Sequence, residues 1–420
     1  MKSRQAGLAF ILITVSIDMV AFGIVAPVLP KLVLNFLGGH TADAAKWFGL
    51  FGTVFALMQL FCSPMLGMLS DRFGRRPVII LSNVGTSLDF IIMALSPTIW
   101  WLFAGRVIAG ITTSSVTTAY AYITDVTTRE KRAAAMGMVG AAFGVGFIVG
   151  PAIGGILGNI DPRLPFWVCA GLSMANALYG FFVLPESLKP DHRQTRFAWE
   201  RANPFGALKL LRSHPELSKL AFINFIEYVA HEVLPVVFTL YVMYRYAWNL
   251  AQVGWSLAVV GLSIAIVQSV VMRPAVAWLG ERRALITGLS FGTFAFALVG
   301  YASSGVIMIA AIVVTAFWGL AGPPAQSLMT HRVSAREQGE LQGALGSMRS
   351  IAMLVGPGLF SMLFAYSIDK SHTWQVPGAA WYFAAFLLAI TVVLAVNVGD
   401  AHEAAERGAV GQQETPNPAA

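Results

Sequence analysis

Five ionisable side chains lie inside stretches of the sequence that are otherwise apolar. Asp18 interrupts FILITVSIDMVAFGIVAPVLP, and Asp89 and Arg106 interrupt two later runs of the same kind. Glu227 and His231 are four residues apart in FIEYVAHEVLP, so a helix places both on one face. A charge near the centre of a bilayer costs roughly 2.5–3.5 kcal/mol on the insertion scale, which makes such residues functional candidates by default. The chemistry they predict is the loading and release of protons; the alternative is a set of buried ion pairs that only fix helix packing.

The composition indicates what surrounds these residues. Of the 420 residues, 56% are hydrophobic and 12% are charged, whereas soluble domains average about 25% charged residues. An apolar run of roughly 20 residues crosses a bilayer as a helix, because a helix satisfies its own backbone polar groups. We predict an all-α polytopic membrane protein with twelve transmembrane helices. They are expected near 6–36, 46–69, 77–96, 98–124, 133–158, 164–184, 219–243, 251–272, 284–301, 303–328, 341–366 and 376–398.

One long polar stretch divides these spans into two sets of six. We expect an N-terminal six-helix half over 1–184, a cytoplasmic linker over 185–218 and a C-terminal half over 219–399. The polar tail over 400–420 contains Gly and Pro and is expected to be disordered.

The two halves share a sequence pattern. GRRPVII at 74–80 resembles GERRALI at 280–286, and further glycines and a proline recur at the same offset of 206 residues. Two parallel, pseudo-symmetric six-helix repeats with a site between them near the midplane are a known transporter architecture. The matching positions are Gly74 with Gly280, Gly137 with Gly343, Gly140 with Gly346, Gly150 with Gly356 and Pro151 with Pro357.

The distribution of Lys and Arg predicts the orientation. With both termini and the linker on the cytoplasmic side, that side receives all but seven of the 28 basic residues. The net charge of +7 therefore indicates membrane orientation, and we expect no nucleic-acid partner. The seven exceptions are Lys31, Lys46, Arg106, Arg163, Arg245, Arg349 and Lys370.

The intramembrane charges fall at two depths, counted at about 1.5 Å per residue. Asp18, Asp89 and Arg106 come out at roughly 18–20 Å from the cytoplasmic edge of a ~30 Å core. Glu227 and Arg349 come out at roughly 12 Å, and an ion pair between them is expected. For Asp89 and His231 a structural role is the stronger interpretation, whereas Asp18 is the first candidate for proton coupling.

The loop between the second and third spans contains a second cluster, GMLSDRFGRRPV at 67–78. Glycines permit close backbone approach where one helix ends and the next begins, and an acid among arginines can build a charge-assisted network to neighbouring helix ends. Such a network would act as a cytoplasmic latch; the alternative is a simple positively charged anchor. The residues concerned are Gly67, Asp71, Arg72, Gly74, Arg75 and Arg76.

This loop resembles the signature of the major facilitator superfamily. GFIVGPAIGG at 146–155 resembles the motif of its drug/proton antiporters, and IDMVAFGIVAPVLP, LFAGRVIAGIT and LGERRALI…VGPGLF look like tetracycline/proton efflux proteins. The resemblance implies that the antiporter motif sets the direction of transport, that Arg106 takes part in proton transfer and that Gln268 is a polar cavity position. The antiporter motif comprises Gly146, Gly150, Pro151, Gly154 and Gly155.

The sequence also departs from the family that it resembles. Tetracycline exporters typically carry an acid in the ninth helix and a histidine in the eighth, whereas here Gly292 falls near the acid's position and the eighth span has no histidine. These departures place tetracycline in doubt as the substrate. The twelve-helix scaffold and proton coupling are still expected.

We therefore predict a proton-coupled secondary transporter that exports a drug-like small molecule by alternating access, as a monomer in the inner membrane. Its energy source is the proton gradient, with no cofactor, no metal and no enzymatic activity expected; the sequence contains no GxxxxGK[ST] motif for ATP binding. Proton-coupled uptake of a metabolite and a transporter-like sensor or scaffold are the alternatives.

Overall fold

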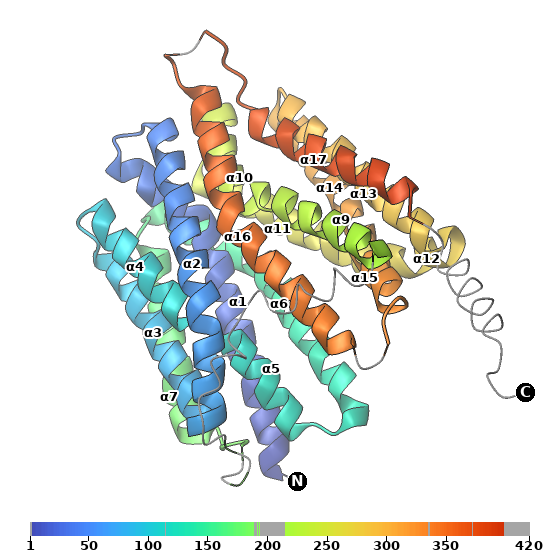
Figure 1. The fold of residues 1–420 in the computed structure, drawn as a ribbon. Helices are drawn as coiled ribbons and strands as arrows, with labels where there is room; N and C mark the ends of the chain where they lie inside the picture. Colours follow the sequence, from blue (N-terminus) through green and yellow to red (C-terminus); the bar gives the residue numbers. More distant parts are fainter. Residues whose placement is uncertain are drawn as a thin grey trace, which may run out of the picture.

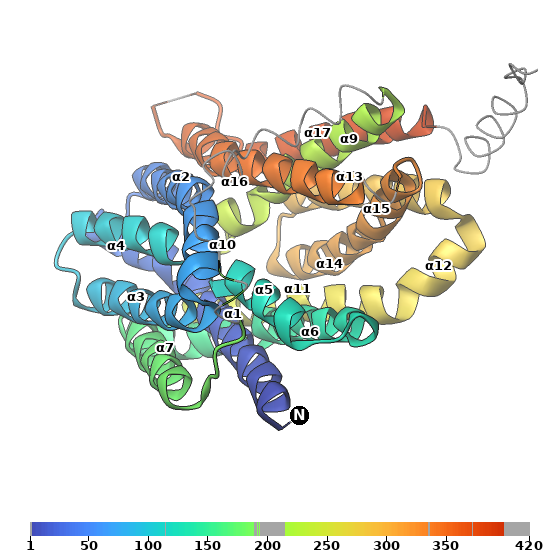
Figure 2. The same cartoon turned by 60° about the horizontal axis from the view of Figure 1, so that its bottom comes forward.

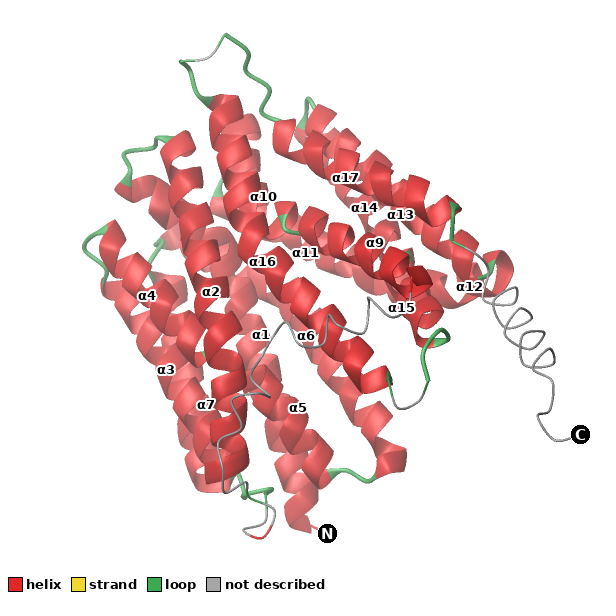
Figure 3. Cartoon of the chain, in the orientation of Figure 1, coloured by secondary structure: helices red, strands yellow, loops and turns green. Residues whose placement is uncertain are grey.

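A computed structural model describes residues 2–113, 115–188, 191, 193, 215–334, 337–371 and 373–398. Figure 3 shows helices joined by loops throughout this part of the chain. The N-terminal group of helices comprises α1 (Lys2–Phe36), α2 (Thr41–Phe73), α3 (Arg75–Leu95), α4 (Ile99–Thr112), α5 (Ser115–Val126), α6 (Arg129–Ile160) and α7 (Leu164–Val183). The C-terminal group comprises α9 (Pro215–His231), α10 (Val233–Tyr246), α11 (Leu250–Ile266), η4 (Val267–Val271), α12 (Met272–Leu279), α13 (Glu281–Tyr301), α14 (Gly305–Thr315), η5 (Ala316–Leu320), α15 (Gly322–Thr330), α16 (Gln338–Ile368) and α17 (Ala379–Val396).

The predicted set of twelve membrane-spanning segments agrees with these helices. Eleven helical segments in the described part of the chain are long and apolar enough to cross a membrane, and α4 with α5 supplies the twelfth. The interruption between α4 and α5 follows a pair of threonines. Thr112 and Thr113 donate their hydroxyls to the carbonyls of Ile108 and Ala109 at 2.9 and 2.6 Å, a side-chain bond that bends helices.

Three segments of the C-terminal group are irregular in their middle. The seventh span breaks between α9 and α10, the eighth contains the five-residue π-helix η4, and the tenth contains the 3₁₀-helix η5. The π- and 3₁₀-turns change the pitch locally, and π-turns within α-helices frequently occur at functional sites. Sequence periodicity did not predict these irregularities.

The two groups of helices lie side by side (Figures 1 and 2). Within the N-terminal group, α1 packs on α6 and α3 on α7; within the C-terminal group, α13 packs on α17 and α9 on α16. Two long helices carry the contact between groups, α6 against α11 and α16 against α2. The division at residues 184 and 219 stays a prediction, because most of the linker and all of the tail from 400 onward lie outside the described residues.

The groups meet closely at the end where α2 begins. A Cβ added at Gly52 would lie 2.7 Å from the Pro357 side chain of α16, and one at Gly155 of α6 would lie 2.9 Å from Cα of Gly254 of α11. These helices therefore approach backbone to backbone, as small residues allow in membranes. The contact closes one end of the molecule.

The same helices separate toward the opposite end, where α2 ends and α16 begins (Figure 1). A Cβ added at Gly67 of α2, Gly137 of α6 or Gly346 of α16 would meet no atom of another described segment within 4 Å. The structure is thus closed at one end and splayed at the end that carries the GMLSDRFGRRPV loop.

Candidate transport site and gate

Two of the predicted intramembrane charges form a buried ion pair. Arg106 Nη2 of α4 lies 2.8 Å from Asp89 Oδ2 of α3, and the two side chains are 15% and 2% exposed. A Cβ at Gly105 would lie 2.7 Å from Asp89 Oδ1, so the glycine makes room for the carboxylate. The guanidinium also lies over the ring of Phe55 at 5.8 Å. The predicted meeting of Asp89 and Arg106 at one depth is present in the structure.

Asp18 is half-buried on α1, one residue before the surface that α1 presents to α6. A Cβ at Gly146 of α6 would lie 2.5 Å from the Met19 side chain, and one at Gly150 would lie 2.7 Å from the Val20 carbonyl. Thr14, one turn earlier, is buried and donates a hydrogen bond to Asn176 of α7 at 3.1 Å. Asp18 therefore lies where α1, α6 and α7 are held together.

The predicted cluster of Glu227, His231 and Arg349 in the C-terminal half does not contain the expected Glu227–Arg349 ion pair. Glu227 is buried in α9, and the described residues contain no ion pair between it and Arg349. The guanidinium of Arg349, on the exposed side of α16, lies over the ring of Tyr228 at 6.0 Å. The expected ion pair was wrong because Glu227 and Tyr228 are neighbours on a helix, about 100° apart, and only Tyr228 is in contact with Arg349.

Glu227 is instead directed toward an aromatic side chain. The indole of Trp318 in η5 lies beside its carboxyl, and the ring of His231 lies 5.7 Å from that of Trp318. Gln268 is exposed within the π-helix η4, and its amide nitrogen would lie 3.8 Å from a Cβ at Gly319, the residue after Trp318. The three irregular segments of the C-terminal group thus converge at Trp318, a residue that the sequence analysis missed.

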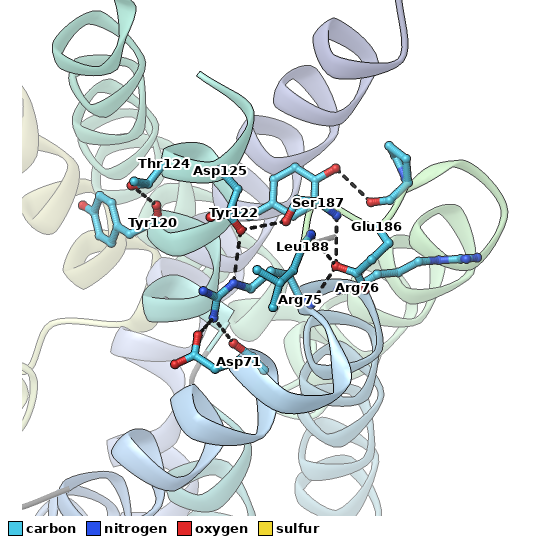
Figure 4. Close-up of polar contacts among 12 residues, drawn as sticks. Asp71, Arg75, Arg76, Tyr120, Tyr122, Thr124, Asp125, Glu186, Ser187 and Leu188 are labelled. Carbon is cyan, nitrogen blue, oxygen red and sulfur yellow. Dashed lines mark hydrogen bonds and ion pairs between the residues drawn. The ribbon is translucent and has the colours of Figure 1, made fainter. Parts of the chain in front are cut away.

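The predicted loop between α2 and α3 forms the expected charge network (Figure 4). Arg75 Nη1 lies 2.5 Å from Asp71 Oδ1, and its Nε lies 3.3 Å from Asp125 Oδ2 at the end of α5. Ser187, after α7, donates to the same Asp125 oxygen at 3.0 Å. All of these contacts lie within the N-terminal group.

Glu186 is the centre of a second part of this network. Its carboxylate accepts hydrogen bonds from the backbone N–H groups of Arg75, Ser187 and Leu188 at 2.9–3.1 Å and of Arg76 at 3.3 Å. An anion at a helix N-terminus satisfies unpaired N–H groups and the helix dipole, so Glu186 caps α3.

The remaining residues of the loop have simpler surroundings. Gly74 joins α2 to α3 with φ +108, a conformation that other residues rarely adopt. Arg76 Nη2 donates to the Phe181 carbonyl at 2.5 Å, while Arg72 is exposed over the Phe73 ring. Asp125 and Glu186 were not among the residues predicted from the sequence. Each is an acid directly after an apolar span at the arginine-rich end, and that position is the signal that could have found them.

The predicted antiporter motif on α6 contacts both groups of helices. Gly146, Gly150 and Gly154 face α1, where a Cβ at Gly154 would overlap the Ile24 carbonyl. Gly155 faces α11, whereas Pro151 contacts both helices: a Cβ at Gly254 of α11 would overlap its carbonyl, and a Cβ at Gly23 of α1 would lie 2.9 Å from its ring. The motif therefore packs α6 between its own group and the other group.

The corresponding positions of α16 repeat this arrangement. A Cβ at Gly356 would lie 2.5 Å from Glu232, at the break between α9 and α10 of its own group. Pro357 faces α2 of the other group, where a Cβ at Gly49 would lie 2.9 Å from its carbonyl oxygen. The 206-residue offset read in the sequence thus corresponds to equivalent packing positions in space.

The family model of the Major Facilitator Superfamily matches residues 11–357 and 220–418. The chain belongs to the Major Facilitator Superfamily. It is 36% identical to the class C tetracycline resistance protein of Escherichia coli, over 92% of this chain and 95% of that protein. It is 34% identical to the class B protein of Escherichia coli, over 91% and 95%.

Solved structures of superfamily transporters have the same fold. The human organic anion transporter MFSD10 superposes with a TM-score of 0.67 at 22% identity, covering 93% of this chain and 99% of that one. The nucleoside transporter NupG gives 0.74 at 11% identity, covering 95% and 99%. As a superfamily member, the chain is a multi-pass membrane transporter of a small molecule, and the predicted fold class is confirmed.

Proposed function

We propose that this transporter exports a drug-like small molecule of the tetracycline type in exchange for protons. The observation that carries the proposal is the 36% identity with a tetracycline resistance protein across 92% of the chain. The alternating-access part of the proposal is supported by a structure that is closed at one end and splayed at the other. The membrane is the inner membrane of a bacterium, the arginine-rich end and both termini are cytoplasmic, and the transporter acts as a monomer.

Asp18 is the proposed coupling residue, and Glu227 is the second candidate. Support for Asp18 comes from its position in α1, adjacent to the Met19 and Val20 contacts with the antiporter motif. The helix that carries this carboxyl also contacts α10 and α11 of the other half, so rocking of the two halves changes the surroundings of α1. Protonation at Asp18 is thereby linked to the conformation that the motif stabilises.

The network around Arg75 is proposed as the cytoplasmic latch of the transport cycle. It fixes the ends of α2, α3 and α5 as one unit within the N-terminal half. In the closed state of that end, this unit would dock against the C-terminal half. Asp71→Asn removes one carboxylate of the network, and an unchanged transport rate in a normally inserted variant would eliminate the latch role.

Everted vesicles that contain the transporter test the proposed function. An inward-acid pH gradient is imposed, tetracyclines and other drug-like compounds are added, and substrate-induced proton release is recorded with a pH-sensitive dye. Wild type is compared with Asp18→Asn and with a matched control, Asp43→Asn, whose side chain is 54% exposed at the start of α2.

The expected result is proton release in wild type and Asp43→Asn and none in Asp18→Asn. Release that survives in Asp18→Asn would remove this residue from the coupling step and direct the search to Glu227. If no compound causes release in wild type, drug/proton antiport is refuted for the panel tested.

A further inference from the structure

The most unusual acid of the C-terminal group is Glu227. Its residue is 9% exposed, and Oε2 is buried without a hydrogen-bond partner among the described residues. The indole of Trp318 is adjacent to the carboxyl, and its Nε1 is also buried and unpartnered, so no hydrogen bond joins the two groups in the described part of the chain. Two unsatisfied polar groups inside a membrane protein require an explanation.

The neighbouring acid on the same segment differs in one respect. Glu232 is five residues further on, at the break between α9 and α10, and is half-buried. The described residues hold no ion pair of either acid, and no atom of the Glu232 carboxyl is among the buried side-chain atoms without a partner. Of the two acids, Glu227 is therefore the one whose carboxyl is both buried and unsatisfied in the described part of the chain.

Aromatic rings surround the uncompensated carboxyl. Trp318 lies between His231, with ring centroids 5.7 Å apart, and Phe296, with centroids 5.3 Å apart. His231 is exposed although it lies in the middle of a spanning segment, so one face of this aromatic group is accessible. The π-segment places the exposed amide of Gln268 next to Gly319, at the edge of the same group.

We propose that Glu227, Trp318 and His231 form a recognition site for flat aromatic organic cations, an inference that rests on the proposed export function. An anionic carboxylate buried without a partner is unstable, so the site holds either a proton or a cationic ligand. The exposed ring of His231 stacks on the planar ring of the ligand, and Trp318, which is only 8% exposed, packs against His231 and fixes that ring. Glu227 therefore selects for charge, while Trp318 and His231 select for shape.

Binding of a cation at this site displaces the proton of Glu227. When a permanent cation binds, the O–H bond of the Glu227 carboxyl breaks, the proton leaves to solvent and the carboxylate pairs with the ligand. Net charge is conserved in the site, because one cation replaces one proton. Cation binding must then release protons even in the purified protein, where there is no gradient.

Ethidium and phenanthridine provide matched probes. Ethidium is a planar permanent cation, and phenanthridine is its parent ring system, uncharged at neutral pH. Binding of each to the purified full-length transporter in detergent is measured by fluorescence, and proton release by ethidium is measured in weakly buffered solution. The variants are Glu227→Gln, Trp318→Leu and, as the matched control, Glu232→Gln.

Wild type is expected to bind ethidium at least about tenfold more tightly than phenanthridine, since truncating one partner of a buried charge pair weakens binding by a larger factor than this. Glu227→Gln should lose this preference and the proton release, Trp318→Leu should weaken both probes, and Glu232→Gln should resemble wild type. Size-exclusion profiles establish that each variant is folded.

Three results would each overturn the proposal: no ethidium binding by wild type, equal affinity for the two probes, or wild-type ethidium affinity and proton release in Glu227→Gln. None of them bears on proton antiport as such, because the vesicle assay with tetracyclines is independent of these probes. Conversely, ethidium binding with Glu227-dependent proton release but no coupled transport in vesicles would leave the recognition site intact and refute export.

Discussion

Removing one partner of the Asp89–Arg106 ion pair should destabilise the N-terminal group strongly. Asp89→Asn leaves a guanidinium that is only 15% exposed without its carboxylate at 2.8 Å. Breaking a buried pair in this way costs about 3–5 kcal/mol. For a half of this size, where 1 kcal/mol shifts the Tm by roughly 2–4 °C, the expected decrease is about 6–20 °C.

The chain contains its own reporter for this measurement. Cys169 is completely buried in α7, which packs on the Asp89 helix α3, and Cys62 is the only other cysteine. In a Cys62→Ala background, a thiol-reactive fluorescent dye labels Cys169 only when this part of the protein unfolds. Asp43→Asn is the matched control, because the Asp43–Lys46 pair is about half-exposed and such pairs contribute about 0–1 kcal/mol.

The double variant Asp89→Asn/Arg106→Gln separates structure from proton transfer. Its Tm should decrease by less than the sum of the two single variants, with a coupling energy of about 1–3 kcal/mol. If the pair only fixes packing, the folded double variant still shows substrate-induced proton release; if either group carries protons, release is lost. A Tm for Asp89→Asn that equals wild type would refute the stabilising role of the pair.

Two further predictions concern glycines. Gly74→Ala should lower the free energy of unfolding by about 1–3 kcal/mol, because φ is +108 and the added Cβ would meet the Glu186 carboxylate. Gly280→Ala, at φ +75 with nothing within 4 Å of the added Cβ, should cost only the backbone part of this. Thermal unfolding of the whole protein followed by circular dichroism compares the two variants. Gly254→Leu should separate α6 from α11 and abolish substrate-induced proton release in vesicles. Gly137→Ala, where the added Cβ has free space, should retain this release. If Gly254→Leu releases protons at the wild-type rate, the close α6–α11 contact is not part of the transport cycle.

The sequence predicted those parts of the structure that depend on the bilayer and on repetition. Twelve spans follow from hydropathy, and the repeat of Gly150–Pro151 as Gly356–Pro357 follows from a fixed offset. Depth counting also placed Asp89 and Arg106 together correctly, because rise per residue is constant along a helix. The span count, the repeat and the depth of these charges depend only on positions along the sequence and along the helix axis.

The site in the C-terminal group could not be predicted in the same way. Depth counting placed Glu227 level with Arg349, but the contact depends on rotation about the helix axis, which depth does not specify. The irregular turns η4 and η5 change that rotation locally, and they bring Gln268 close to Gly319, the residue after Trp318, on a different spanning segment of the sequence. Regular helical periodicity therefore does not predict a site that is assembled at helix irregularities.

The contacts between the two groups of helices differ from those within each group, and this difference favours the proposed rocking motion. Contacts between the groups at the closed end, such as Gly155 with Gly254 and Gly52 with Pro357, are formed largely by backbone and small side chains. They can separate and reform without rotamer changes in interlocked large side chains. Within the N-terminal group the α1–α6 contact is also formed at glycines, but this group has bonded contacts in addition, such as the Glu186 cap of α3 and the buried Asp89–Arg106 pair. A displacing force therefore opens the boundary between the groups before it deforms either one.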